Sequence, residues 1–332
     1  MKRTALVTGA NSGLGFEAAA QLAQAGYARV ILACRTLEKA ERARQQLVER
    51  VGHDPFETLA IDVADLASSQ AAAETLIARN QAIDALLLNA GLVPGDTLST
   101  SKDGHELSFA ASVVGHHVLT MRLLAAGRLD GARIVIAGSE AANNDLPSMM
   151  GMSVYDFATG APRTFGSTLR EAMLAFARAE RPEAYVGTRT YSTTKVFSAW
   201  WSAALARRLG DRASVFTVSP GSNLSTNAAR NTRGIQRFLF TRVMPAIGSL
   251  IGWDQPVSAG ARRYLDVLDG GKAFVSGRTY TSAPGKMVGA LHEVTMLHIT
   301  DVERQETAWD VLTTLTGVGF PAASDLTPAP LV

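Results

Sequence analysis

Tyr191 and Lys195 stand four residues apart in the stretch YSTTK, within a segment whose composition favours a helix. Side chains at positions i and i+4 share one helix face, so the phenol and the ammonium can reach a common space. A phenol exchanges protons readily near neutral pH only if its pKa falls from about 10 by roughly 3 units. Such a change requires about 4 kcal/mol. A cation about 5 Å away supplies roughly 3 kcal/mol of this at an effective dielectric of about 20. Taken alone, the pair is more simply a half-buried tyrosine beside a surface lysine, so its meaning depends on the rest of the chain.

A glycine-rich turn, TGANSGLG, lies between the apolar run TALVT and an alanine-rich segment. Glycine permits positive φ and a close approach of backbone to a phosphate. The N-terminus of the following helix offers free N–H groups and the positive end of its dipole to an anion. The order of strand, glycine turn and helix therefore predicts a dinucleotide-binding turn, although its spacing is TGxxxGxG rather than GxGxxG. Its predicted cofactor-binding residues are Gly9, Asn11, Ser12, Gly13, Leu14 and Gly15.

Short apolar runs alternate with longer alanine-rich segments through the first two thirds of the chain. We expect helices over 15–25, 37–51 and 66–79, and strands at TALVT, RVILAC, ETLAID, ALLLN, RIVIAG and SVFTVS. Continuously apolar strands separated by helices indicate βαβ units and a parallel sheet buried on both faces. Right-handed crossovers then give a single doubly wound (Rossmann-type) α/β sheet with helices on both faces. We expect one domain over 1–320 and a flexible tail over 321–332.

Two segments, 141–189 and 222–253, interrupt this alternation. Segments of such length usually carry function or are disordered, and the apolar content of these two favours a packed lid. The first contains the stretch MMGMSVYDF. Its side chains are expected to form either an adaptable lipophilic wall for a substrate or part of the core: Met149, Met150, Met152, Tyr155 and Phe157.

Composition excludes several classes of function. Of the 332 residues, 47% are hydrophobic and 19% charged, and the formal net charge of +2 predicts no nucleic-acid partner. The single cysteine, Cys34, can form neither an internal disulfide nor a zinc cluster, and no metal site is expected. We expect a cytoplasmic protein without a signal peptide. The lipophilic stretch 238–253 contains Arg242 and Pro245 and is too short for a membrane span, so none is expected.

The glycine turn, LLLNAG, YSTTK and SPG, in this order, resemble the short-chain dehydrogenases/reductases, especially members with an extended insert such as retinol dehydrogenases and protochlorophyllide reductases. Further similar stretches are ILACRTLEKAE, IDVADL, RIVIAGSEAAN and QETAWDVLTTLTG, so the resemblance covers most of the chain. It implies that Tyr191 donates or accepts a proton and that Ser139 polarises the substrate oxygen. Lys195 would modulate Tyr191 and hold the nicotinamide ribose. Further implied cofactor contacts are Asp62 and Val63 at the adenine, Asn89, Ala90 and Gly91 at the ribose, and Pro220 and Gly221.

The second predicted strand ends at Cys34 and is followed by Arg35. An NAD-preferring site commonly has an acidic residue here, which accepts hydrogen bonds from the ribose hydroxyls. Arginine instead pairs with a 2′-phosphate through its planar fork. We therefore expect NADP(H) as cofactor, the alternative being that Arg35 is only a solvated charge at the start of a helix.

One position departs from the family pattern. Members similar to retinol dehydrogenases usually have an asparagine three residues before a Gly-His pair, where it supports a bound water and a proton relay. Here Ser112 takes that place, before Gly115 and His116. A serine hydroxyl can also hold a water, with one fewer directed group, so Ser112 is a fourth candidate catalytic residue. His116 and His117 are expected to be packed or surface side chains rather than metal ligands.

These observations predict an NADP(H)-dependent oxidoreductase that transfers hydride between the nicotinamide and a small lipophilic carbonyl or alcohol. Two alternatives stay open: a reductase of C=C bonds, as the resemblance to protochlorophyllide reductase suggests, and a non-catalytic NADP-binding regulator or scaffold. The resemblance allows a monomer or a homodimer. The sequence does not identify the substrate or the physiological direction.

Overall fold

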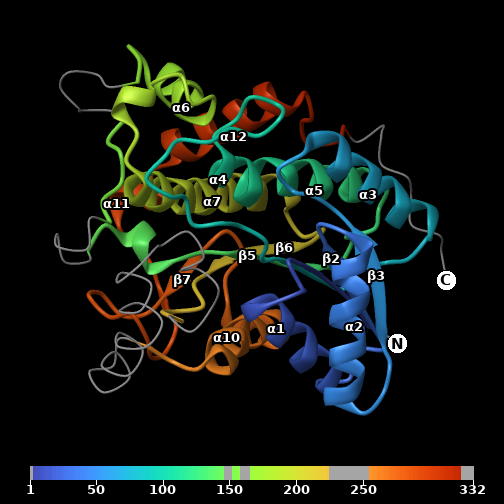
Figure 1. The fold of residues 1–332 in the computed structure, drawn as a ribbon. Helices are drawn as coiled ribbons and strands as arrows, with labels where there is room; N and C mark the ends of the chain where they lie inside the picture. The colour runs from blue at the N-terminus through green and yellow to red at the C-terminus, as the bar shows by residue number, and fades with distance from the viewer. Residues whose placement is uncertain (1–2, 146–151, 158–164, 224–253, 323–332) are drawn as a thin grey trace.

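A single mixed sheet runs through the residues that the computed structural model describes, which are 3–145, 152–157, 165–223 and 254–322 (Figure 1). The strand order is β3-β2-β1-β4-β5-β6-β7-β8. The parallel strands are β1 (Thr4–Thr8), β2 (Arg29–Cys34), β3 (Phe56–Ala60), β4 (Ala85–Leu88), β5 (Arg133–Ala137), β6 (Ser214–Val218) and β7 (Thr279–Thr281). The last strand, β8 (His292–Glu293), pairs antiparallel to β7. The predicted doubly wound sheet and its six strands are confirmed.

Helices cover both faces of this sheet (Figure 1). One face carries α1 (Gly13–Gln24), α2 (Leu37–Val51) and α10 (Val257–Asp269), which share one apolar core with the sheet. The other carries α3 (Leu66–Ala78), α5 (Gly115–Ala125) and α7 (Gly187–Leu209) around a second core. Two further helices, α6 (Leu169–Ala177) and α12 (Val302–Thr316), pack together, and α12 lies against α7. Short helical pieces are α4 (Leu107–Phe109), the π-helix Ala110–Val114, α11 (Leu297–Thr300) and the 3-10 turns Glu140–Asn143, Pro182–Ala184 and Gly271–Ala273.

Local sequence signals explain where helices begin and end. The N-cap Thr36 accepts a hydrogen bond from the Lys39 amide, and Gly52 ends α2 in the left-handed conformation, where glycine avoids strain. As a result, α2 has the bounds that the sequence predicts. Thr168 and Glu171 form a capping box that starts α6 inside the insert.

The described part of the 141–189 insert is packed into the core. The rings of Tyr155 and Phe157 each contact that of Phe165, and all three contact Phe176 of α6. Phe176 in turn stacks on Phe197 of α7 with centroids 5.9 Å apart. Of the two roles considered for Tyr155 and Phe157, packing is therefore the one that the structure supports. Met152 is half-buried. Met149, Met150, the block 224–253 and the tail beyond residue 322 lie outside the described residues.

One helical span in the described part of the chain, Leu107–Ala125, is long and apolar enough to cross a membrane by length and composition. It joins α4, the π-helix and α5, and 89% of its most apolar window is buried inside the molecule. Its neighbours are α3 and α7, which flank it on the same face of the sheet. Such burial is typical of the core helix of a folded domain.

The packing of the insert gives a stability prediction. Phe176 is 4% exposed, and its ring contacts those of Phe109 and Phe197. We expect Phe176→Ala to lower the free energy of unfolding by about 3 to 5 kcal/mol, because it removes a buried ring and leaves a cavity. Leu297→Ala is the control, since Leu297 is 85% exposed, and it should change stability by less than about 0.5 kcal/mol. Equal losses in urea unfolding of the two variants would contradict this packing.

Candidate active site

The glycine turn between β1 and α1 is shaped to leave backbone amides open. Gly9 and Gly13 have φ of 68° and 57°, in the region that favours glycine. A Cβ at Gly15 would lie 2.4 Å from the carbonyl oxygen of Gly9, so α1 can approach the end of β1 only with glycine at this position. The N-cap Ser12 makes no side-chain capping bond, and the first turn of α1 has no acidic residue. The N-terminus of α1 is therefore a suitable place for a phosphate.

The Thr8 hydroxyl connects this turn to β4 and α5. Its Oγ1 accepts a hydrogen bond from the Ala90 amide (2.9 Å), and the Asn89 side-chain amide donates to the Thr8 carbonyl (3.0 Å). On its other side, Oγ1 lies 3.0 Å from Nε2 of His116. These bonds bring the predicted ribose-side residues Asn89 and Ala90 next to the glycine turn.

His116 is fully buried, and its surroundings fix its tautomer. Nδ1 lies 3.0 Å from the carbonyl oxygen of Ser112, which can only accept, so Nδ1 carries the proton. Nε2 then accepts from the Thr8 hydroxyl. Burial lowers the pKa of His116 to about 4, and the charge of Lys195 acts in the same direction. His116 is therefore a neutral structural link, and His117, whose Nε2 lies 2.8 Å from the Val318 carbonyl oxygen, is likewise packed.

Ser112 lies in the π-helix and faces the Asn89–Gly91 segment. It is 4% exposed, and a Cβ built on Gly91 would lie 3.0 Å from its Oγ. Within the described residues, this Oγ has no hydrogen-bond partner. Single-turn π-helices occur often at functional sites, and an unpaired buried hydroxyl is costly unless it binds something. The position predicted for a relay group therefore carries a hydroxyl that is free to hold a water.

The predicted catalytic side chains come together at the carboxyl end of β5. Ser139 lies two residues after the end of this strand, and its hydroxyl is hydrogen-bonded to the Tyr191 hydroxyl. Lys195 is 7% exposed and donates from Nζ to the carbonyl oxygen of Ala137 at 2.8 Å. Its Nζ lies 5.8 Å from the centre of the Tyr191 ring. The YSTTK spacing thus places both side chains on one face of α7, as the sequence predicts.

The electrostatics of Tyr191 differ from the expectation based on sequence. Burial raises the pKa of Tyr191, the Ser139 hydrogen bond lowers it, and the charge of Glu140 raises it. Lys195 does not lower it here, because the ammonium is directed to the Ala137 carbonyl and burial dominates. Burial also lowers the pKa of Lys195 to about 8. At neutral pH Tyr191 is therefore protonated and Lys195 is mostly charged.

The adenine end of the predicted site lies at β2 and β3. Arg35 is 64% exposed, and its Nε lies 3.5 Å from Oδ2 of Asp62, so the two predicted contacts are neighbours. The Asp62 Oδ1 accepts from the Ala64 amide, and the Asp62 amide donates to Ser68, which fixes the turn after β3. Val63 is buried beside it. The guanidinium of Arg35 is therefore accessible at the sheet edge.

Sequence reasoning missed two charged residues beneath the site. Glu140, directly after Ser139, and Arg263 on α10 form an ion pair with side chains 3% and 6% exposed. Glu140 also accepts a hydrogen bond from the hydroxyl of Ser219, next to the predicted cofactor residues Pro220 and Gly221. The sequence does contain a sign of the buried Arg263, because this residue falls on the apolar face of α10 with Gly260, Tyr264 and Val267. A charge at such a position indicates a buried partner.

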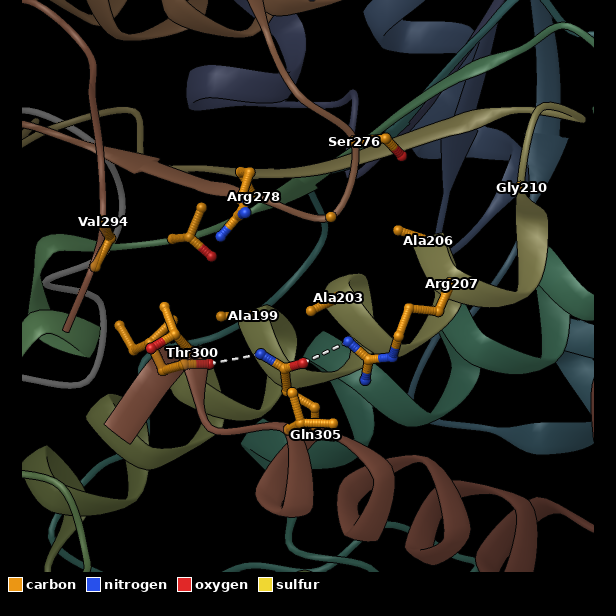
Figure 2. Close-up of a pocket in the computed structure, with 14 residues that line it drawn as sticks. Ala199, Ala203, Ala206, Arg207, Gly210, Ser276, Arg278, Val294, Thr300 and Gln305 are labelled. Carbon is orange, nitrogen blue, oxygen red and sulfur yellow. Dashed lines mark hydrogen bonds between the residues drawn. The ribbon is translucent and has the colours of Figure 1, made fainter. Parts of the chain in front are cut away.

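A cavity of about 370 Å³ lies elsewhere, between the C-terminal half of α7, the segment 276–279 and the region of α11 and α12 (Figure 2). Gln305 crosses it, accepting from Arg207 at 2.6 Å and donating to the carbonyl oxygen of Ile299 at 3.0 Å. Its lining begins two turns of α7 beyond Tyr191 and includes none of the predicted site residues. We therefore assign it no part in the chemistry.

The fold and this strand-end site define a nucleotide-binding protein of the doubly wound class. Residues 3–174 match the sequence profile described as short chain dehydrogenase, and the chain belongs to this family, which uses a nicotinamide cofactor. Similar proteins include a WW domain-containing oxidoreductase of Drosophila melanogaster, 30% identical over 75% of this chain and 55% of that protein. Another is retinol dehydrogenase 14 of Mus musculus, 30% identical over 69% of this chain and 63% of that protein. The predicted resemblance to retinol dehydrogenases is confirmed, although the chain spans less than two thirds of either relative.

Solved structures show the same fold. An uncharacterized protein from Mycobacterium paratuberculosis aligns with a TM-score of 0.68, at 23% identity, over 97% of this chain and 96% of that one. A short chain dehydrogenase from Burkholderia cenocepacia in complex with NADP aligns with a TM-score of 0.56, at 22% identity, over 84% and 95%. A 3-ketoacyl-(acyl-carrier-protein) reductase from Brucella melitensis complexed with NADH aligns with a TM-score of 0.56, at 19% identity, over 86% and 98%.

The free hydroxyl of Ser112 gives a prediction about the site. If it holds a relay water, Ser112→Ala should lower turnover by about tenfold to a hundredfold, because water-mediated bonds are modest and replaceable. Ser108→Ala is a matched control from the same helical span, since its hydroxyl already has a partner in the Leu92 carbonyl. Turnover of Ser112→Ala equal to that of Ser108→Ala, in steady-state kinetics, would exclude a relay through this position.

Proposed function

We propose that this protein is an NADP(H)-dependent oxidoreductase that transfers hydride between the nicotinamide and a small lipophilic carbonyl or alcohol. The observation that carries this proposal is the convergence of Ser139, Tyr191 and Lys195 at the carboxyl end of β5. Strand ends of this kind, beside a glycine turn, are where doubly wound folds bind ligands and position catalytic groups.

The chain's own residues fit a dinucleotide along this edge of the sheet. The open N-terminus of α1 suits the pyrophosphate, and Gly15 permits the close packing that this requires. The segment Asn89–Gly91 and Lys195 would hold the ribose on the nicotinamide side, and Pro220 and Gly221 would border the nicotinamide. When bound, the cofactor supplies the hydride chemistry. The protein supplies orientation and the proton.

Proton transfer is the task of Tyr191. Its raised pKa keeps the phenol protonated at neutral pH, so it can donate to a carbonyl oxygen that becomes an alkoxide. Ser139, hydrogen-bonded to the same hydroxyl, is placed to donate to that oxygen as well. Lys195, whose ammonium donates to the Ala137 carbonyl rather than to the phenol, would serve to hold the ribose. This arrangement suits proton donation to a carbonyl oxygen at neutral pH.

A lipophilic substrate is supported by the surroundings of the α7 N-terminus. Val186, which precedes α7, is 45% exposed, and Val93, which follows the NAG segment, is 38% exposed. The segments that carry them touch, because a Cβ on Gly187 would lie 2.4 Å from the Gly95 carbonyl oxygen. Exposed apolar side chains beside a predicted catalytic residue favour apolar substrates over charged ones.

We propose that the protein does not form a homodimer through the outer face of α7, because other segments of the same chain already cover this face. Trp200 and Trp201 are 2% and 0% exposed, and Trp200 donates to the His298 carbonyl oxygen. On the same side, the Arg208 guanidinium lies over the ring of Trp309 from α12, with its Cζ 4.1 Å from the ring centre. The protein would therefore be a monomer or use another surface.

Cofactor preference provides one test. We expect NADPH to bind more tightly than NADH, and Arg35→Ala to remove most of that difference, because the guanidinium would pair with the 2′-phosphate. Fluorescence titration of each nucleotide measures this. Arg42→Ala is the control, since Arg42 lies nearby on helix α2 and is paired with Glu38. Equal affinity of the unmodified protein for both nucleotides would overturn the NADP(H) assignment.

The proton role of Tyr191 provides another test. Tyr191→Phe should keep NADPH binding and reduce turnover by about a hundredfold to ten-thousandfold, because only the proton donor is lost. Lys195→Met should weaken binding as well as turnover. In the unmodified protein, kcat/KM for NADPH should fall as the pH rises above about 8, where Lys195 loses its charge. Near-normal turnover of Tyr191→Phe would move the proton role to another group.

A C=C reductase would use the same tyrosine to protonate carbon, and only substrate profiling separates it from a carbonyl reductase. The non-catalytic alternative is favoured by one observation, the serine at position 112 in place of the usual asparagine. NADPH consumption with a panel of ketones, aldehydes and enones distinguishes the three, since a regulator would bind NADPH and consume none.

A further inference from the structure

Glu140 is a buried carboxylate next to the predicted catalytic serine. It is 2% exposed, and both of its oxygens are used. Oε2 accepts from the Ser219 hydroxyl, and Oε1 accepts from the Ser282 amide (3.2 Å), the Ser282 hydroxyl (2.9 Å) and the Arg263 Nη1 (3.2 Å). The carboxylate therefore joins four segments that are remote in sequence.

Arg263 completes this network from α10. It is 5% exposed. Beyond Glu140, its Nη1 donates to the Ser219 carbonyl oxygen at 3.2 Å, and its Nη2 donates to the Ser282 hydroxyl at 2.9 Å and the Gly289 carbonyl oxygen at 2.6 Å. The planar guanidinium thus binds the chain after β6 and the chain after β7 at the same time.

The network ends at the predicted nicotinamide border. The Ser219 hydroxyl, which donates to Glu140, accepts from the Gly221 amide at 3.1 Å. Gly221 has φ of 75°, and a Cβ there would lie 2.9 Å from Nη1 of Arg263, so the loop packs directly on the guanidinium. Glu140 thereby links the backbone that carries Ser139 to the backbone at Gly221.

We propose that Glu140 and Arg263 are a positioning pair for this reaction, which fixes Ser139 and the Ser219–Gly221 loop relative to each other. The inference rests on the proposed function and adds to it two residues that act through others. Burying an ion pair costs desolvation, and well-packed apolar side chains often serve stability as well or better. A charged pair whose directed bonds join four segments is explained by the geometry that it imposes at the strand ends.

The charge of Glu140 also reaches the proton donor. The ionisable groups around it are Tyr191 and Lys195 on α7, Arg263 and Tyr264 on α10, and His298 on α11, whose Nε2 lies near the Ala142 carbonyl oxygen. The negative charge raises the pKa values of Tyr191 and Tyr264, and Arg263 opposes it at Tyr264. Removing the charge of Glu140 must therefore lower the pKa of Tyr191, a change that a merely structural role would not produce.

The experiment compares Glu140→Gln, the charge-free double variant Glu140→Gln with Arg263→Met, and the control Arg262→Met. Arg262 is adjacent on α10 and forms an exposed pair with Asp266, so this control removes an arginine from the same helix without touching the network. NADPH dissociation constants come from fluorescence titration. Steady-state reduction of the best substrate over a range of pH gives kcat, KM and the high-pH limb of kcat.

We expect both Glu140 variants to bind NADPH about tenfold more weakly and to lose about tenfold to a hundredfold in kcat, because small displacements at a reacting centre are costly. The high-pH limb of kcat should move to lower pH in both, since reduction needs Tyr191 protonated and its pKa has fallen. Arg262→Met should match the unmodified protein in every measurement.

Each outcome has a distinct meaning. If Glu140→Gln is folded and shows an unchanged NADPH dissociation constant, kcat and pH limb, the positioning role is wrong. If Glu140→Gln does not fold, the double variant, which leaves no unpaired charge, carries the same test. If the unmodified protein binds NADPH but reduces nothing, the proposed function fails, and the dissociation constants of the variants still decide whether the pair positions the loop.

Discussion

The structure depends on the close approach of α1 to the end of β1, which only glycine permits at position 15. Beside this contact, the pairing of β1 with β4 lets the Thr8 carbonyl and hydroxyl bond to Asn89 and Ala90 at the neighbouring strand end. The same hydroxyl holds His116, whose other nitrogen bonds to the Ser112 carbonyl oxygen. The glycine turn, the segment Asn89–Gly91 and the π-helix are thus connected through this close approach and the hydrogen bonds of Thr8 and His116.

A second group of buried polar contacts organises the opposite half of the site. Around Glu140 and Arg263, the ends of β5 and β6 and the chain after β7 are joined by hydrogen bonds to charged groups, which are stronger than neutral ones. Tyr191 and Lys195 on α7 lie between the two groups, with Lys195 bonded to the end of β5. Parallel strands align their carboxyl ends at one edge, so residues far apart in sequence meet there without any long-range motif.

The sequence predicts the sheet well because its central strands are continuously apolar, and such runs are distinctive when helices separate them. The strands β1 and β2 and the helix α2 have the predicted bounds, the last because Thr36 and Gly52 mark its two ends. The strands β7 and β8 were missed, since three and two residues show no periodicity. The helix α6 was also missed, because the prolines of the insert obscured its capping box.

The residues of the candidate site also differ in how well the sequence predicts them. Spacing within one helix or one turn is visible in sequence, which is why Tyr191, Lys195 and the glycine turn could be proposed from it. Glu140 and Arg263 are 123 residues apart, and only the folded chain shows that each is the partner of the other. The direction of the pKa shift of Tyr191 differs from the expectation for a related reason, because burial and the charge of Glu140 depend on tertiary packing rather than on the YSTTK spacing.

Hydride transfer from NADPH can be followed with an isotope label. NADPH carrying deuterium at C4 of the nicotinamide should be incubated with the protein and a lipophilic ketone or enone, and the product examined by mass spectrometry and NMR. The account predicts an alcohol with one deuterium on the former carbonyl carbon, and a deuterium on the β-carbon of an enone would instead identify a C=C reductase. NADPH binding without label transfer to any carbonyl substrate would contradict it.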